Sequence, residues 1–301
     1  MNHKIDLNKI EECSLREAQL IMLDILKEVH RICEKHNLRY FLSDGTLLGA
    51  VRHQGFIPWD DDLDISMPRE DYNKFMAIAQ GELSEDYFMQ TMKTDPYYKL
   101  YHVPLKVRYN KSLFIEDGEN HKKYHQGIYI DIFPMDKAPD SMGKYSLQSK
   151  LSKFLLVSKM KINTRDFPSV KFFGRTISQV LGKAVSFKMV DKILFSTYKW
   201  NKEATGEYYT QGPEIIWSHR FKADSLFPLK KIKFEDSEFW VPNKPEDILT
   251  IMFGDFMKLP PEDQRLYHAK FIGKYKDEEA ENQTGKSKAT ISNSQSLSSE
   301  A

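Results

Sequence analysis

Apolar side chains recur three or four positions apart over residues 14–36, a spacing typical of one face of a helix. Ser14 opens this segment and Glu17 follows three residues later, which matches a capping box. The apolar positions are Ala18, Met22, Ile25, Val29 and Ile32. The pattern therefore predicts an amphipathic helix that begins after Ser14.

Shorter β-like segments alternate with helical ones up to residue 133. "LDISM" at 63–67 predicts a strand that Pro68 ends, and residues 69–83 repeat apolar positions at helical spacing. Gly45 predicts a turn that leads into a further helix. Other strands are predicted at 38–44, 87–92, 101–109 and 127–133. This order predicts a mixed α/β fold in which a sheet is backed by helices.

The charge pattern changes after Pro139. Residues 141–202 contain thirteen lysines and arginines against two acids, Asp166 and Asp191, with apolar residues between them. We interpret this segment as a basic, mostly helical insertion. Two interpretations stay open: an amphipathic surface that docks on anionic lipid, or a helical cap whose lysines face water. No nucleic-acid-reading motif accompanies the charge, so nucleic acid is not expected as a partner.

Composition sets limits on the class of protein. A chain of 301 residues with 41% apolar content can bury a sizeable core, and 44 basic against 43 acidic residues point to no partner. Cys13 and Cys33 are too few for a disulfide framework, and no Cys/His cluster indicates zinc. The first residues lack the features of a secretory signal, and no apolar run approaches the ~18 residues that span a bilayer. We expect a soluble, cytoplasmic protein.

Four carboxylates crowd into five positions of "PWDDDLDISMP": Asp60, Asp61, Asp62 and Asp64. Like charges at this spacing need a positive partner when they leave water. In a strand, Asp62 and Asp64 project from the same face. Asp131 lies alone in the apolar segment "IYIDIF". If the two strands are neighbours, these three carboxylates converge on a site of hard oxygen ligands suited to Mg²⁺ or Mn²⁺.

A calcium loop is the alternative, because Asp60, Asp62 and Asp64 have the 1-3-5 spacing of an EF-hand. The sixth position of such a loop must be glycine, whereas this chain has Ile65 there, and Pro68 falls inside the loop. The calcium loop is therefore rejected.

The segment "SDGTLLGAVR" supplies groups that suit a phosphate. Gly45 can expose backbone N–H groups at the N-terminus of a predicted helix. Thr46 is expected to cap that helix and to donate a hydroxyl, and Arg52 to reach oxygens in bidentate fashion. Arg52 and Lys106 are the candidates for added positive charge on a bound diphosphate. Gly45 and Thr46, followed by paired acids and then by a third acid, form the layout of the nucleotidyltransferase fold.

The segment "YFLSDGTLLGAVRHQGFIPWDDDLDISMPREDYNKF" resembles the signature of the LicD family, which are bacterial phosphocholine transferases related to the fukutin-type ribitol-phosphate transferases. The resemblance continues through "LKVR" (105–108), "GIYIDIFPMD" (127–136) and "FGDFMKLPPEDQRLYH" (253–268). It covers roughly residues 15–140 and 205–270. The fold that it implies is a nucleotidyltransferase-like mixed sheet backed by helices.

The chain is accordingly divided into four parts. Residues 1–140 form the catalytic core, 141–204 the basic helical insertion or cap, and 205–275 the C-terminal part of the catalytic domain. The tail, 276–301, is polar and nearly free of large apolar groups, so we expect it to be disordered.

The resemblance implies transfer of a phospho-alcohol, usually phosphocholine from CDP-choline, to a sugar hydroxyl of a teichoic-acid or lipopolysaccharide precursor, with release of CMP. Asp62 and Asp64 would ligate Mg²⁺ or Mn²⁺, and Asp131 would be the third ligand and the base for the acceptor hydroxyl. The acceptor would be lipid-linked. A choline pocket should use aromatic faces, although each aromatic candidate is expected first to fill the core. These candidates are Trp59, Tyr129, Trp217, Trp240 and Tyr267.

Two other functions compete with this one. A nucleotide-sugar glycosyltransferase also uses an Asp-x-Asp metal site, but its motif normally follows a dinucleotide-type βαβ region, and none precedes residue 60. A non-catalytic, cation-stabilised envelope protein would bind CDP-choline without turnover. His53 and His268 are weaker candidates for acid–base catalysis, because a lone histidine is more often structural.

Overall fold

The computed structural model of the chain describes residues 9–98, 103–116, 123–159, 185–215, 219–265 and 267–276. The tail from residue 277, the middle of the insertion (160–184) and Trp217 lie outside these ranges. The disorder expected of the tail therefore stays a prediction.

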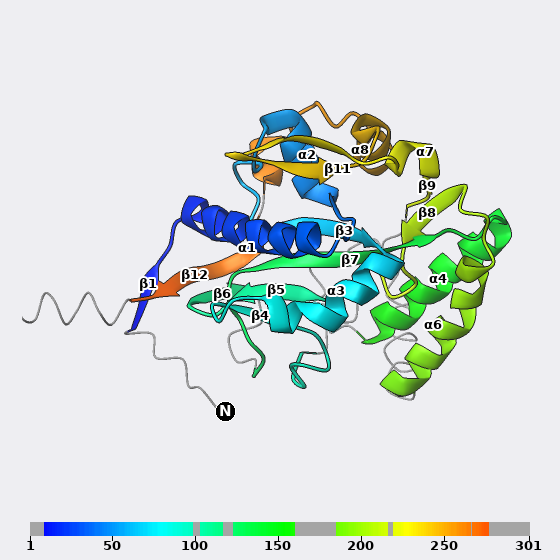
Figure 1. Cartoon of the computed structure of the whole chain (residues 1–301), viewed down its shortest axis with the longest axis horizontal. Coiled ribbons are helices and arrows are strands. Elements are labelled where there is room, and N and C mark those ends of the chain that lie inside the picture. The colour runs from blue at the N-terminus through cyan, green and yellow to red at the C-terminus, as the bar shows by residue number, and fades with distance from the viewer. Residues whose placement is uncertain are drawn as a thin grey trace, which may run out of the picture.

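A seven-stranded mixed sheet forms the centre of the molecule (Figure 1). Its strands are β2 (Phe41–Leu42), β3 (Asp64–Pro68), β4 (Tyr87–Gln90), β5 (Lys106–Tyr109), β7 (Tyr129–Lys137), β8 (Tyr208–Gln211) and β9 (Phe221–Lys222). Five of them follow the order β2-β3-β7-β5-β4, while β8 pairs with the last residues of β7 and β9 pairs with β8. β3 and β7 are parallel, and the other pairs are antiparallel. The mixed α/β class expected from the sequence is confirmed.

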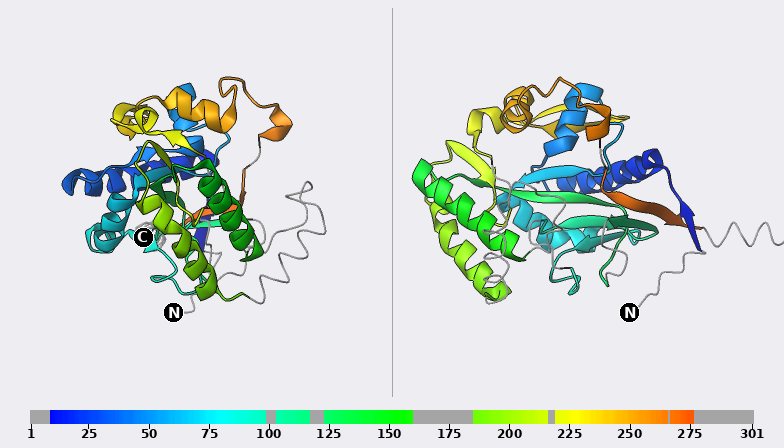
Figure 2. Two further views of the ribbon diagram at one scale, coloured as in Figure 1. Left: turned by 90° about the vertical axis from the view of Figure 1, so that its right-hand side faces the viewer. Right: turned by 180° about the vertical axis from the view of Figure 1, so that it is seen from behind.

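Helices α1 (Leu15–Lys35) and α3 (Arg69–Glu82) lie on one face of this sheet, and the view from behind in Figure 2 shows the strands in front of them. The capping box expected at the start of α1 is present. The Ser14 hydroxyl accepts from the Glu17 N–H at 3.2 Å, and the Glu17 carboxylate accepts from the Ser14 N–H at 2.9 Å. These two bonds satisfy donors that the helix leaves open and fix where α1 begins.

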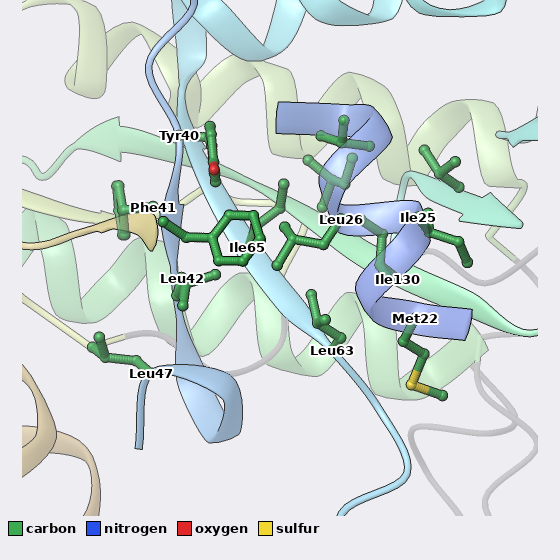
Figure 3. Close-up of a cluster of buried hydrophobic side chains, with 14 of the residues drawn as sticks. Met22, Ile25, Leu26, Tyr40, Phe41, Leu42, Leu47, Leu63, Ile65 and Ile130 are labelled. Atoms are coloured by element: carbon green, nitrogen blue, oxygen red, sulfur yellow. The ribbon is translucent and has the colours of Figure 1, made fainter. Parts of the chain in front are cut away.

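The main core lies between α1 and the sheet (Figure 3). Apolar side chains of α1 pack on those of β3 and β7, and each of them has no exposed surface. They are Met22, Ile25, Leu26, Leu63, Ile65 and Ile130. Each buried side chain of this size contributes about 1.5–3 kcal/mol. Because side chains alternate along a strand, Asp64 and Asp131 must point to the opposite face of the sheet.

Two smaller β units complete the fold. One is a three-stranded sheet in the order β1-β12-β6, and the other is the hairpin β10-β11, which lies with α2 and α8 in a separate layer (Figure 1). The elements concerned are β1 (Ile10–Glu12), β6 (Ser112–Glu116), β10 (Lys230–Phe234), β11 (Ser237–Val241), β12 (Ala269–Tyr275), α2 (Asp44–His53), α7 (Ala223–Leu226) and α8 (Pro245–Phe253). β10 and β11 pair as an antiparallel hairpin, and α8 ends with Gly254 as its C-cap.

The basic insertion contains two long helices, α4 (Met142–Lys159) and α6 (Phe187–Lys202), which lie side by side (Figure 2). Leu155 and Leu156 of α4 meet Val190 and Leu194 of α6 in a small core of their own. The described part of the insertion is thus helical, as its sequence predicts.

One central strand is longer than its sequence suggests. β7 continues to Lys137 through Pro134, although proline cannot donate a hydrogen bond within a sheet. The strand tolerates this residue because β5 pairs only with Tyr129–Asp131, and β8 begins its pairing at Met135. Pro134 therefore lies where one neighbour ends and the next begins.

Candidate active site

Three charged side chains form one row across the central sheet. Asp64 of β3 is opposite Asp131 of β7, and Lys106 of β5 is opposite Asp131 on the other side. Paired residues point to the same face, which is the face opposite α1. Lys106 Nζ lies 2.6 Å from Asp131 Oδ1, and their side chains are 4% and 9% exposed. The condition for a shared site, that the two acidic strands are neighbours, is met, and the register adds a buried ion pair.

Three further carboxylates surround this row: Asp44, Asp60 and Asp62. Burial is the first cause that raises the pKa of Asp60 to about 8, and the charge of Asp62 adds to it. Burial also raises the pKa of Asp44 to about 6, and it raises that of Asp131 to about 6 against the opposing effect of Lys106. The pKa of Asp64 is raised for the same reason, with repulsion from Asp62 and Asp44 next. The cluster is therefore poor in positive charge.

The donor set of this cluster fits a divalent metal ion. Carboxylate oxygens are the ligands that Mg²⁺ and Mn²⁺ prefer, and Asp44 Oδ2 is buried without a hydrogen-bond partner among the described residues. The side chains do not form a closed coordination shell, however. Within the described ranges, no group of three His, Cys, Asp or Glu side chains could hold a metal ion as they lie. The metal-ligand role of Asp62, Asp64 and Asp131 stays a prediction.

Asp44 was not among the site residues predicted from the sequence. This residue is the first of α2 and has a φ of +49°, a left-handed conformation that non-glycine residues seldom adopt. It lies close enough to Asp62 and Asp131 for their charges to raise its pKa. The sequence did contain a signal for this residue, because Asp44 is an acid directly before Gly45, at the end of a predicted strand.

Gly45 and Thr46 hold the start of α2 against the acidic loop. A Cβ atom on Gly45 would lie 2.9 Å from Asp60 Oδ2, so a side chain here would displace that carboxylate. The Thr46 hydroxyl accepts from the Asp64 N–H at 2.8 Å, which fixes the first residue of β3. The expectation that Thr46 caps the helix is wrong: the N-cap is Ser43, and Thr46 lies within the first turn because α2 begins at Asp44.

Arg52 lies in the last turn of α2, eight residues from Asp44, or roughly 12 Å at the rise of a helix. Its guanidinium donates to the Phe256 carbonyl oxygen at 2.7 Å and to the His53 ring at 2.9 Å. The His53 ring in turn packs edge-on against Trp59. Neither Arg52 nor His53 belongs to the carboxylate row, and their chemical roles stay predictions.

Tyr129 lies between two cations. Lys106 Nζ is 3.4 Å and the Arg108 guanidinium carbon 4.7 Å from its ring centre, and its hydroxyl donates to Glu116 at 2.8 Å. Two other aromatic candidates for a choline pocket have partners of their own. Trp240 donates to Glu34 at 2.8 Å, and the Trp59 ring faces the guanidinium of Arg265 at 4.6 Å.

Asp61 differs from its neighbours, because it is 1% exposed and its Oδ2 atom accepts hydrogen bonds from two backbone N–H groups at the start of β12. It accepts from the His268 N–H at 2.6 Å and from the Ala269 N–H at 2.7 Å. This aspartate ties the acidic loop to a segment more than 200 residues away. No sequence signal separated it from Asp60 and Asp62.

A second buried ionic group joins the insertion to the core. The Arg69 guanidinium donates to Asp136 at 2.6 Å and to Glu214 at 2.7 Å, and the Tyr198 hydroxyl of α6 donates to Asp136 at 3.1 Å. A mostly apolar cavity of about 350 Å³ lies beside it, between α3 and α6. Asp136 is five residues beyond Asp131, or roughly 16 Å along β7. The cavity and its ion pairs are therefore separate from the carboxylate row.

We expect Arg69→Met to lower the free energy of unfolding by about 3–5 kcal/mol, because it leaves the buried Asp136, and the partly buried Glu214, without their cation. Urea unfolding followed by circular dichroism measures this loss. Lys244→Met, which breaks an exposed pair with Asp224, is the matched control and should leave the urea midpoint unchanged. Equal midpoints for both variants would show that the Arg69 group contributes no stability.

The chain is similar to known proteins over most of its length. The profile of the family described as "LicD/FKTN/FKRP, nucleotidyltransferase domain" matches residues 37–178. The lipopolysaccharide cholinephosphotransferase LicD of Haemophilus influenzae is 31% identical over 271 residues, which are 86% of this chain and 97% of that protein. The human ribitol 5-phosphate transferase FKRP is 48% identical over 70 residues, 23% of this chain and 13% of that protein. The expected resemblance is confirmed, and the chain belongs to the LicD family.

Proposed function

We propose that this protein transfers phosphocholine, or a similar phospho-alcohol, from a CDP-activated donor to a sugar hydroxyl of a cell-surface glycan precursor such as teichoic acid or lipopolysaccharide, and releases CMP. The observation that carries the proposal is the row of Asp64 and Asp131, in register on parallel strands, with Asp62 two residues away. The relatives support the type of reaction, because LicD is a cholinephosphotransferase and FKRP is a ribitol 5-phosphate transferase.

Asp62, Asp64 and Asp131 would hold a Mg²⁺ or Mn²⁺ ion, with Asp44 as a further oxygen donor near them. Such an ion lowers the pKa of a hydroxyl and offsets negative charge on a leaving phosphate. Repulsion between neighbouring carboxylates contributes to the raised pKa values of Asp44, Asp64 and Asp131. A bound cation would offset this repulsion.

Asp131 is the proposed base. The acceptor hydroxyl would give its proton to Asp131, while its oxygen bonds to the phosphorus of phosphocholine and the bond from that phosphorus to the CMP oxygen breaks. Burial raises the pKa of Asp131 above that of an ordinary carboxyl group, which makes the carboxylate a stronger base. Lys106 would keep the carboxylate oriented through the Nζ–Oδ1 contact.

The experiment that tests the proposal is incubation with CDP-choline, Mg²⁺ and a lipopolysaccharide or teichoic-acid acceptor, followed by chromatography of the nucleotides. Release of CMP together with a choline-bearing acceptor is the expected result. Release of a nucleoside diphosphate from a nucleotide sugar would instead favour a glycosyltransferase. Binding of CDP-choline without turnover would favour a non-catalytic envelope protein.

We also propose that the protein works in the cytoplasm and touches the inner face of the membrane through the insertion. Four lysines and Phe195 recur at intervals of three and four residues on α6, so they share one face. They are Lys188, Lys192, Phe195, Lys199 and Lys202. All are exposed, and the Phe195 ring is 71% exposed. No helix in the described ranges is long and apolar enough to cross a bilayer.

Lys192→Glu combined with Lys199→Glu should weaken binding to vesicles that contain phosphatidylglycerol by about tenfold or more, since each lysine near an anionic surface is worth about 1 kcal/mol. Vesicle sedimentation measures this change. Neutral phosphatidylcholine vesicles are the control for lipid charge, and Lys230→Glu with Lys233→Glu on β10 is the control for a loss of positive charge elsewhere. Equal binding by both double variants would contradict the assignment of this face.

A further inference from the structure

His268 precedes β12 and is attached to the acidic loop by three hydrogen bonds. Its backbone N–H and that of Ala269 donate to Asp61 Oδ2, and its ring Nδ1 lies 3.0 Å from Asp61 Oδ1. Asp61 is buried, so both the backbone and the ring of His268 are held by one fixed carboxylate. A carboxylate that binds one ring nitrogen determines where the other nitrogen points.

The other side of the ring is open. The His268 side chain is 68% exposed, and no described residue forms a hydrogen bond with Nε2. Among the described residues, the other cations near the cluster are bonded to the protein itself, and Arg52 donates to His53 and to the Phe256 carbonyl oxygen. Lys106 is paired with Asp131, and the Arg108 guanidinium donates to the Gln90 side chain and the Gly127 carbonyl.

His268 also carries positive charge toward the acidic loop. Its charge lowers the pKa values of Asp60 and Asp62, so the ring lies within electrostatic reach of both. The hydrogen bond that the ring donates to Asp61 is the first cause that raises the pKa of His268 to about 9, and the charges of Asp61, Asp62 and Glu116 add to it. At neutral pH the ring is therefore an imidazolium whose Nε2–H can donate.

We propose that His268 is a phosphate-binding residue of the transfer site, and that Asp61 turns its Nε2–H toward an oxygen of the donor's diphosphate. A diphosphate brings negative charge to a cluster of carboxylates, so it needs charged donors that the protein has not already used. His268 meets this need from the exposed edge of the cluster. The inference rests on the proposed function, because it assumes a nucleotide diphosphate donor, and it adds a residue that contacts that donor.

The test compares nucleotides with a nucleoside. Calorimetry in Mg²⁺, without acceptor, measures binding of CDP-choline, CMP and cytidine to the wild-type protein and to His268→Gln. Glutamine keeps the backbone N–H that bonds to Asp61, so the fold should be retained, and thermal unfolding checks this. We expect CDP-choline and CMP to bind about ten- to a hundredfold more weakly, as for a lost hydrogen bond between charged groups, and cytidine to bind unchanged.

His36→Gln is the matched control, because His36 also pairs with a carboxylate, Glu82, at 3.0 Å, but lies at the end of α1. It should bind all three compounds as the wild-type protein does. Equal affinities of His268→Gln and wild type for CDP-choline would overturn the inference, and so would an equal loss for cytidine, since the loss would not then be at the phosphates. If the wild-type protein neither binds CDP-choline nor releases CMP, the proposed function fails and this inference with it; wild-type activity beside an unaffected variant overturns the inference alone.

Discussion

Asp62→Asn should reduce transfer by at least about a thousandfold and, in the presence of EDTA, should unfold at a higher temperature than the wild-type protein. The activity falls because a metal ligand is lost. A metal ion stabilises the charge of the transition state by several kcal/mol in such reactions, and each loss of about 1.4 kcal/mol lowers the rate tenfold. The stability rises because the asparagine amide brings no charge to a cluster in which Asp62 raises the pKa values of Asp44, Asp60 and Asp64.

Burial of Asp60, together with the charge of Asp62, sets the sign of the pH dependence. The pKa of Asp60 is about 8 in the folded protein and close to the ordinary value of about 4 in the unfolded chain. Between these values the folded state binds more protons than the unfolded state, so the free energy of unfolding falls as pH rises from about 4 to about 8. Asp62→Asn should make this fall smaller.

Thermal unfolding and CMP release, each measured with EDTA and with Mg²⁺, check these expectations together. Mg²⁺ should raise the unfolding temperature of the wild-type protein and have less effect on Asp62→Asn. Asp236→Asn, which changes an exposed aspartate on the β10–β11 turn, is the control and should behave like the wild type. Retained transfer by Asp62→Asn would contradict the metal assignment, whatever its stability.

Local patterns allowed the acidic strands to be predicted as neighbours. Asp64 and Asp131 each interrupt an apolar strand, and a carboxylate in such a place requires a shared partner or a shared ion. The pairing of β3 with β7 in the structure is compatible with this requirement. The same physical reason predicts that both side chains turn away from the core under α1, because Ile65 and Ile130 face it.

Other features of the site depend on distances that a sequence does not contain. Lys106 was a candidate for the diphosphate, but β5 lies beside β7, and this places the ammonium on Asp131. Arg52 lies at the far end of α2 because that helix continues for ten residues. Asp61 and His268 meet only because β12 returns to the sheet that holds β6. These contacts are tertiary, and no local pattern predicts them.

Lys106→Met is expected to lower the free energy of unfolding by about 3–5 kcal/mol in EDTA, because it leaves the Asp131 carboxylate buried without its cation. Chemical unfolding measures this loss. Mg²⁺ should raise the free energy of unfolding of this variant more than that of the wild type, since the ion can then offset the negative charge of Asp131. The variant should also lose most of its transfer activity.

A double-mutant cycle with Asp131→Asn separates the ion pair from the rest of the site. If Lys106 acts on stability through Asp131, the double variant Lys106→Met/Asp131→Asn should be more stable than Lys106→Met alone, because the buried amide carries no charge. Strict additivity of the two losses would contradict a direct pair, in spite of the 2.6 Å contact.

The cycle also distinguishes the two roles of Asp131. A double variant that recovers stability but no transfer is expected if Asp131 is the base, because an amide cannot take the proton from the acceptor hydroxyl. Recovery of transfer together with stability would mean that Asp131 serves the fold alone, and the base would then have to be found among the other carboxylates of the cluster.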